Sequence, residues 1–191
     1  MSFVSLLDNL ENRPLSPTLT RFRDLLDPIS PEGLEALARE SVATTRRQFG
    51  RTMRLFAPIY LSNECVNNCS YCGFSRDNPI LRTTLSVEQV VREARHLASR
   101  GFRNLLLVAG EHPKFVSDGY LEECLEALRD EIPTLAIEVG PMEMPEYRRM
   151  VEAGCEGLVV YQETYHREAY REYHTSGPKK NFDWRVDCPE R

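Results

Sequence analysis

The chain has 191 residues, of which 41% are hydrophobic and 28% charged, and its 24 Lys and Arg against 29 Asp and Glu give a net charge of −5. This length predicts one domain with an appendage, and the composition is that of an ordinary globular protein. The negative balance argues against a protein that holds nucleic acid mainly through phosphate contacts, because such proteins carry a basic patch. The longest apolar run, residues 105–109, is far shorter than the roughly 20 residues of a membrane-spanning helix, so we expect no membrane segment.

The first eight residues have no basic stretch and reach an acid at Asp8, which is unlike a secretory signal. We therefore expect a cytoplasmic protein, in which thiols stay reduced. Six cysteines are present, and three of them are clustered at Cys65, Cys69 and Cys72. In a reducing compartment this clustering indicates metal or redox chemistry rather than disulfides.

Residues 1–50 are expected to form a helical extension. Ser16 and Ser30 are each followed by proline, a pattern typical of a helix N-cap with proline at the first helical position. The second of these starts predicts a long polar helix from Glu32 to about Gln48, which Gly50 ends.

From residue 51 to residue 191 the pattern changes to alternating strands and helices. Strands are predicted at residues 58–61, 104–109, 135–139 and 157–162. Helices are predicted at residues 86–100, 120–128, 145–153 and 166–174, and a further helix begins at Asp183. This alternation predicts an α/β fold with a parallel sheet and right-handed crossovers. Four βα units are half of the eight in a complete TIM-type barrel, so we expect the first half of such a barrel.

The cysteine cluster forms a CxxxCxxC motif over residues 65–72, directly after the first predicted strand. Thiolates are soft ligands that suit zinc or an iron–sulfur cluster. Structural zinc takes four protein ligands, and only three are local here, so a zinc loop would need a distant fourth ligand. A [4Fe–4S] cluster on three cysteines leaves one iron free for a substrate or cofactor. The position agrees with catalysis, because barrel enzymes react at the carboxyl ends of their strands.

The cysteine spacing, with the aromatic Tyr71 before the third cysteine, resembles the radical S-adenosylmethionine (SAM) enzymes. Other segments resemble the family of 2-iminoacetate synthases, the tyrosine lyases of thiamine thiazole biosynthesis. These segments are residues 60–65, 72–75, 110–112, 161–166 and 176–180, together with Trp184 and Arg185.

This resemblance implies a [4Fe–4S] cluster and SAM as cofactors, and cleavage of the Cα–Cβ bond of tyrosine to 2-iminoacetate and p-cresol. It also implies thiazole synthase and an electron donor such as flavodoxin as partners. The residues that it assigns to the cofactors are Cys65, Cys69 and Cys72 for three irons, Tyr71 and the backbone of Phe74 for the adenine, Gly110 and Glu111 for the methionyl amino group, Glu163 for the ribose, and Arg185 for the SAM carboxylate. The resemblance assigns no residue to the tyrosine pocket.

Several of these residues also have a structural interpretation. Glu163 and His166 are compatible with ordinary polar groups of a loop, and an arginine on a terminal helix such as Arg185 is most often solvated. The remaining cysteines, Cys124, Cys155 and Cys188, are predicted to be structural, because free cysteine is among the most buried residue types.

The relatives complete the barrel, whereas this chain ends before a fifth strand. We therefore expect a truncated or split product that lacks much of the tyrosine pocket and exposes the edges of its first and fourth strands. Two alternatives stay open: the tyrosine lyase that matures [FeFe]-hydrogenase, and a non-catalytic fragment that binds a cluster or SAM. The segment at residues 110–114 favours the thiazole enzyme over the maturase.

Overall fold

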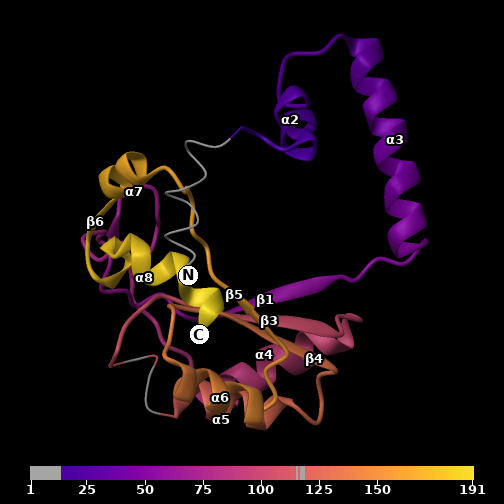
Figure 1. Ribbon diagram of the computed structural model, residues 1–191. Helices are drawn as coiled ribbons and strands as arrows, with labels where there is room; N and C mark the ends of the chain where they lie inside the picture. The colour runs from indigo at the N-terminus through magenta and orange to yellow at the C-terminus, as the bar shows by residue number, and fades with distance from the viewer. Residues whose placement is uncertain (1–13, 115, 117–118) are drawn as a thin grey trace. The chain divides into compact units, whose positions relative to one another are not determined.

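The computed structural model describes residues 14–114, 116 and 119–191 (Figure 1). The chain divides into two compact units, and the division follows Arg54, close to the expected boundary at residue 50. Residues 1–13 of the expected helical extension lie outside the described residues.

The N-terminal unit contains two helices, α2 (Pro17–Asp24) and α3 (Pro31–Phe49). Both begin as predicted: the Leu19 N–H donates to the Ser16 hydroxyl at 3.3 Å, and the Gly33 N–H donates to the Ser30 hydroxyl at 3.2 Å. Neither helix has a buried residue. The two helices are therefore stabilised by their N-caps and by helix propensity more than by a hydrophobic core.

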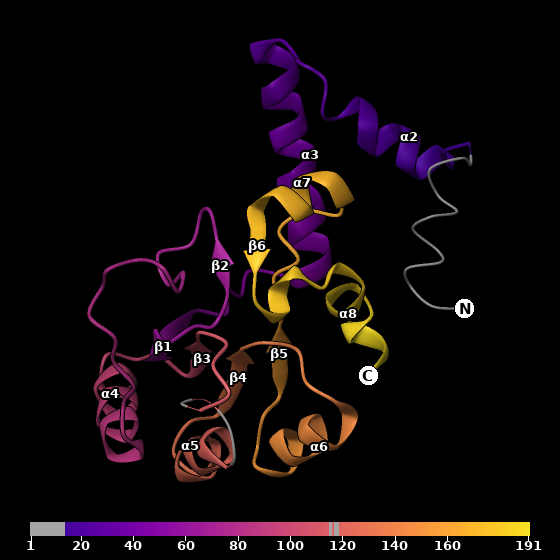
Figure 2. The same ribbon diagram turned by 90° about the vertical axis from the view of Figure 1, so that its left-hand side faces the viewer.

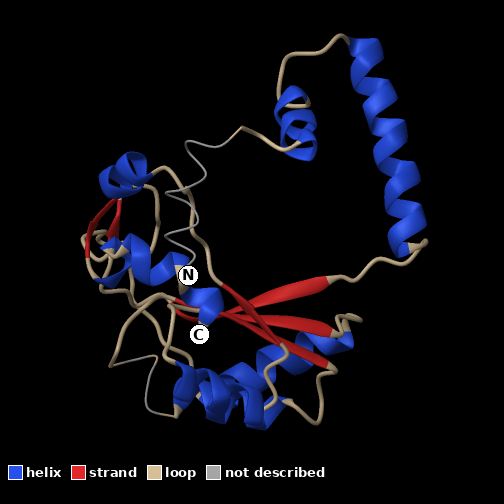
Figure 3. Ribbon diagram, viewed as in Figure 1, coloured by secondary structure: helices blue, strands red, loops and turns tan. Residues whose placement is uncertain are grey.

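The second unit is built on a four-stranded parallel sheet in the order β1-β3-β4-β5 (Figure 3). Its strands are β1 (Phe56–Ser62), β3 (Asn104–Ala109), β4 (Thr134–Glu138) and β5 (Gly157–Val159). The predicted half barrel of four βα units is confirmed. The fourth strand is shorter than predicted, because a turn begins at Gln162, whose carbonyl accepts the Thr164 N–H at 2.9 Å.

Three helices cover one face of this sheet: α4 (Val87–Ser99), α5 (Tyr120–Leu128) and α6 (Met144–Glu152) (Figures 1 and 2). The predicted capping box at the start of α4 is present, with Ser86 and Gln89 each bonding the other's backbone N–H. The core between the layers consists of fully buried apolar side chains such as Leu105, Leu107 and Leu125. Burial of this kind is the main favourable term in folding.

Beyond the carboxyl ends of the strands, the chain forms a small second layer (Figure 1). It contains α7 (Arg167–Tyr173), β6 (His174–Ser176), η1 (Pro178–Lys180), α8 (Phe182–Val186) and η2 (Cys188–Glu190). β6 pairs antiparallel with β2 (Asn68–Cys69), so this layer is joined to the cysteine loop. Strands of two and three residues leave no periodic pattern, and the sequence did not predict this pair. None of the described helices is long and apolar enough to cross a membrane.

Candidate cofactor site

A cavity of about 230 Å³ opens at the carboxyl ends of the strands. All nine residues that the sequence nominated for cofactor binding line it: Cys65, Cys69, Tyr71, Cys72, Phe74, Gly110, Glu111, Glu163 and Arg185. They come from the cysteine loop, the end of β3, the turn after β5 and α8, and 120 residues separate the first from the last in sequence. Only the tertiary fold brings them together.

The cysteine loop is held in shape by Arg82. Its guanidinium donates to the carbonyls of Asn63 and Ser75 at 2.7 Å and to that of Phe74 at 2.9 Å, with longer bonds to two further carbonyls. A guanidinium is a rigid, planar fork of N–H donors, and both terminal nitrogens of Arg82 bond carbonyls here. Arg82 therefore ties the two flanks of the cysteine loop together.

The three clustered thiols face the cavity, with Cys69 buried and the other two half-buried. Burial raises the pKa of the Cys69 thiol, and the Lys179 ammonium opposes this effect. Within residues 14–114, 116 and 119–191, no three His, Cys, Asp or Glu side chains converge closely enough to hold one metal ion. Three soft thiolates on one short loop suit an iron–sulfur cluster that leaves one iron free for a further ligand.

Glu111 follows β3, and its carboxylate is fixed by neighbours on three sides. It accepts a hydrogen bond from the Asn67 amide at 2.8 Å, and an Arg185 nitrogen lies 3.7 Å from the same oxygen. On a third side, a Cβ at Gly140 would lie 2.8 Å from the Glu111 side chain, so a larger residue there would displace the carboxylate. Gly110 is required in the same way, because its Cβ would lie 2.2 Å from the carbonyl of Glu64.

Arg185 is a buried cation, not the solvated one expected of a terminal helix. Its guanidinium donates to the Tyr161 carbonyl at 3.2 Å, and its Nε has no hydrogen-bond partner in the described part of the chain. Burying a charged group without full pairing is costly. An anionic ligand in the adjoining cavity would offset that cost.

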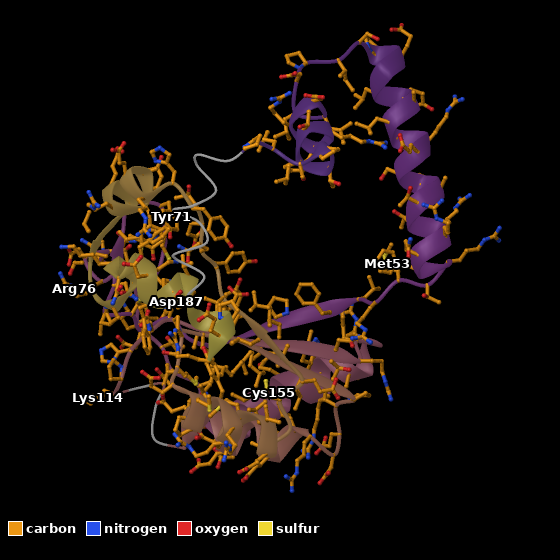
Figure 4. All side chains as sticks on the ribbon, in the orientation of Figure 1. Met53, Tyr71, Arg76, Lys114, Cys155 and Asp187 are labelled. Carbon is orange, nitrogen blue, oxygen red and sulfur yellow. The ribbon has the colours of Figure 1, made fainter. Side chains whose placement is uncertain are left out.

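Tyr71 lies against the second layer, beside α7 and β6 (Figure 4). Its hydroxyl is 2.7 Å from Nε2 of His174, whose Nδ1 is 2.7 Å from the Tyr170 carbonyl. A carbonyl only accepts, so Nδ1 carries the hydrogen, and burial lowers the pKa of His174 and keeps it neutral. Nε2 is then the acceptor for the Tyr71 hydroxyl, and burial raises the pKa of Tyr71 so that the phenol stays protonated.

Glu163 lies in the turn after β5 with a left-handed backbone (φ 69°), which is uncommon for a residue other than glycine. Its carboxylate pairs with the Lys179 ammonium at 2.7 Å. Partial burial is the largest single effect and opposes ionisation, but the hydrogen bond and charge of Lys179, together with Tyr71 and His174, outweigh it and lower the pKa of Glu163. Strained backbone held by an ion pair is typical of functional sites.

Four cavity residues or their neighbours were missed by the sequence analysis: Asn67, Glu138, His174 and Lys179. Asn67 lies between Cys65 and Cys69, and Lys179 lies within residues 176–180, one of the segments that carry the resemblance. Their positions in the sequence were therefore a signal that could have identified them. Glu138 ends β4, and burial, with the charge of Glu163, raises its pKa. The sequence predicts His174 only as the last residue of a helix. Its contact with the Tyr71 hydroxyl joins residues that are 103 positions apart, so no local signal indicates it.

The other three cysteines, predicted to be structural, do not line this cavity. Cys124 is buried on α5, and burial raises its pKa to about 11. Cys188 is 3.0 Å from the Tyr147 hydroxyl, and the Cys155 thiol donates to the Gly157 carbonyl at 3.2 Å; Figure 4 shows Cys155 well away from Tyr71. His166 caps α7 by accepting the Ala169 N–H at 3.2 Å, which agrees with its structural interpretation.

Comparison with known proteins places this cavity in context. The model of the Radical SAM superfamily matches residues 59–191. The chain is 42% identical over 167 residues to 2-iminoacetate synthase of Escherichia coli (strain K12), and 32% identical over 168 residues to 3-methylornithine synthase of Methanosarcina barkeri. These matches cover 87% of this chain but 44% and 47% of the two enzymes, so the chain spans less than half of their length.

The fold resembles a solved structure of a hydrogenase maturase. The X-ray structure of the FeFe-hydrogenase maturase HydG from Carboxydothermus hydrogenoformans superposes with a TM-score of 0.80 at 36% identity. The match covers 85% of this chain and 39% of the maturase.

Proposed function

This chain belongs to the radical SAM superfamily, and we propose that it provides the cofactor-binding part of a tyrosine lyase of the 2-iminoacetate synthase type. Members of the superfamily bind a [4Fe–4S] cluster and SAM. The proposed reaction breaks the Cα–Cβ bond of tyrosine and yields 2-iminoacetate and p-cresol, for the thiazole of thiamine.

The observation that carries the proposal is the convergence of nine separate side chains and backbone segments on one cavity. The residues fit the cofactors: three thiols face the same cavity, and the buried Arg185 beside it has an N–H without a hydrogen-bond partner among the described residues. When bound, the cluster and SAM together supply one-electron cleavage of a carbon–sulfur bond and hydrogen-atom abstraction from the substrate.

The chain's own residues bind and orient the cofactors. Cys65, Cys69 and Cys72 bind three irons, and the fourth iron is left to SAM. Arg185 pairs with the SAM carboxylate through its planar fork, and Glu111, one side chain away, receives the amino group. Because Arg185 attracts the carboxylate and Glu111 attracts the amino group, the two residues together would fix the orientation of the methionyl group of SAM in the cavity.

The adenosine half of SAM is assigned to the other side of the cavity. Tyr71 and the Phe74 backbone would hold the adenine, and Glu163 would hold the ribose. The bond from Tyr71 to His174 fixes the aromatic ring, and the Lys179 ion pair fixes the Glu163 carboxylate. Thiazole synthase and an electron donor such as flavodoxin are the proposed partners.

Anaerobic reconstitution with iron and sulfide, followed by dithionite and SAM, tests the proposal. We expect a cluster to form and SAM to bind, and we expect tyrosine-stimulated 5′-deoxyadenosine and p-cresol when a second chain completes the barrel. Cys69→Ser is expected to abolish the cluster, whereas Cys155→Ser, a matched change at a structural thiol, keeps it. The proposal fails if the wild-type chain takes up no cluster, or if Cys69→Ser binds iron and SAM as the wild type does.

The structural match to HydG supports a second candidate function, that of the tyrosine lyase that matures [FeFe]-hydrogenase. The products of the same assay separate the two. Cyanide and carbon monoxide in addition to p-cresol would support the maturase, and 2-iminoacetate without them supports the thiazole enzyme.

A further inference from the structure

Asn67 lies between the first two clustered cysteines, and its side chain is almost completely buried, with 2% of the residue exposed. Its Nδ2 donates to Glu111 Oε2 at 2.8 Å and lies 3.6 Å from the sulfur of Cys65. Its Oδ1 accepts the backbone N–H of Lys179 at 2.7 Å. An amide offers two N–H donors and one carbonyl, so this side chain satisfies partners from three segments.

The fold is shaped to allow this approach. Gly177, in the turn before Lys179, has a φ of 87°, and a Cβ there would lie 2.4 Å from Asn67 Oδ1 and 2.8 Å from the Val66 carbonyl. Any other residue would push the turn away from the amide. The chain therefore uses a glycine to bring the second layer onto Asn67.

We propose that Asn67 is a positioning residue, which aims the Glu111 carboxylate and donates a hydrogen bond to the Cys65 sulfur. The inference rests on the proposed function, in which Glu111 receives the SAM amino group and Cys65 binds the cluster. Asn67 acts on the cofactors through these two neighbours.

Two measurable consequences follow from the two donated bonds. A hydrogen bond to a cluster sulfur stabilises the added negative charge of the reduced state, and so raises the reduction potential. The bond to Glu111 holds the carboxylate in one orientation before SAM binds, and so lowers the cost of ordering it on binding.

Asn67→Leu has a similar volume and removes both the donor and the acceptor. In the reconstituted full chain we expect SAM binding about tenfold weaker, in line with the loss of one hydrogen bond to a charged group. The midpoint potential of the cluster should shift to a more negative value. Neither measurement depends on turnover.

Asn68→Ala is the matched control, because the neighbouring amide bonds the exposed Asp77 at 2.6 Å and does not line the cavity. It is expected to keep the wild-type potential and SAM affinity. Asn67→Asp is a second variant, which retains the acceptor for the Lys179 N–H but replaces the donor with a carboxylate that repels the Glu111 carboxylate. It should also weaken SAM binding.

A double-mutant cycle with Glu111→Gln decides whether Asn67 acts through Glu111. We expect Asn67→Leu to add no further loss of SAM affinity in the Glu111→Gln background, because coupled residues are not additive. Full additivity would overturn the inference, as would wild-type potential and affinity in both Asn67 variants. A wild-type chain without a cluster would instead overturn the proposed function, and the inference with it.

Discussion

Buried polar side chains gather at one place in this molecule. In the part of the chain that the structure describes, the buried polar or charged residues are Ser62, Asn67, Ser75, His174 and Arg185. All five belong to the end of β1, the cysteine loop or the second layer. Burying such groups costs free energy unless they are paired. We therefore attribute their concentration around the cavity to its function more than to the stability of the fold.

His174 makes the stability of the fold depend on pH. Burial lowers its pKa, so between the unfolded value of about 6.5 and the lower folded value the unfolded chain binds a proton that the folded chain does not. The His174 contribution to stability is therefore complete above about pH 6.5 and is lost as the pH falls below it.

We expect the melting temperature of the metal-free chain to fall between pH 7 and pH 5.5, and the slope to be smaller in His174→Gln. Thermal unfolding followed by circular dichroism measures both. His96→Gln, on the exposed face of α4, is the control and should keep the wild-type slope. An unchanged slope in His174→Gln would show that another group is responsible.

At the scale of elements, the cysteine loop is a preorganised unit. Arg82 lies outside the motif, yet it bonds five backbone carbonyls of the loop and its flanks. The pair β2–β6 then joins the loop to the second layer. Three thiols on a flexible loop would lose more conformational entropy on binding a cluster than these do.

Arg82→Ala is expected to destabilise the chain by about 2–3 kcal/mol, because several charged hydrogen bonds are lost together. It should also reduce the iron retained after reconstitution. Arg76→Ala is a matched control in the same loop, since the Arg76 side chain forms an exposed ion pair with Asp77, worth at most about 1 kcal/mol, and its backbone bonds are kept in the variant. Chemical denaturation and iron analysis measure the two effects. Equal stability of the two variants would contradict the scaffold role of Arg82.

At the scale of the whole molecule, the cavity belongs to one of the two units. Every residue that lines it falls between Tyr60 and Arg185, within the unit that contains Leu55–Arg191. The helices α2 and α3 contribute no buried side chain.

A shortened chain of residues 55–191 is therefore expected to bind the same amount of iron per chain as residues 1–191, and SAM with an affinity within about twofold. Iron and sulfide analysis and titration calorimetry provide the comparison. A loss of tenfold or more in SAM affinity would show that the N-terminal unit contributes to the site.

The sequence by itself determined the regular elements and the core chemistry of the site. The helix starts at Ser16, Ser30 and Ser86, and the strand at residues 104–109, were predicted correctly because caps and continuous apolar runs are local signals. The cysteine motif with its neighbouring segments indicated the family.

Only the tertiary structure decided how the site is held together. The pair β2–β6, the bond from Asn67 to Glu111 and the burial of Arg185 join segments that lie from 44 to more than 100 residues apart. Such contacts leave no periodicity and no cap in the sequence. Their partners become neighbours only when parallel strands bring their carboxyl ends to one edge of the sheet.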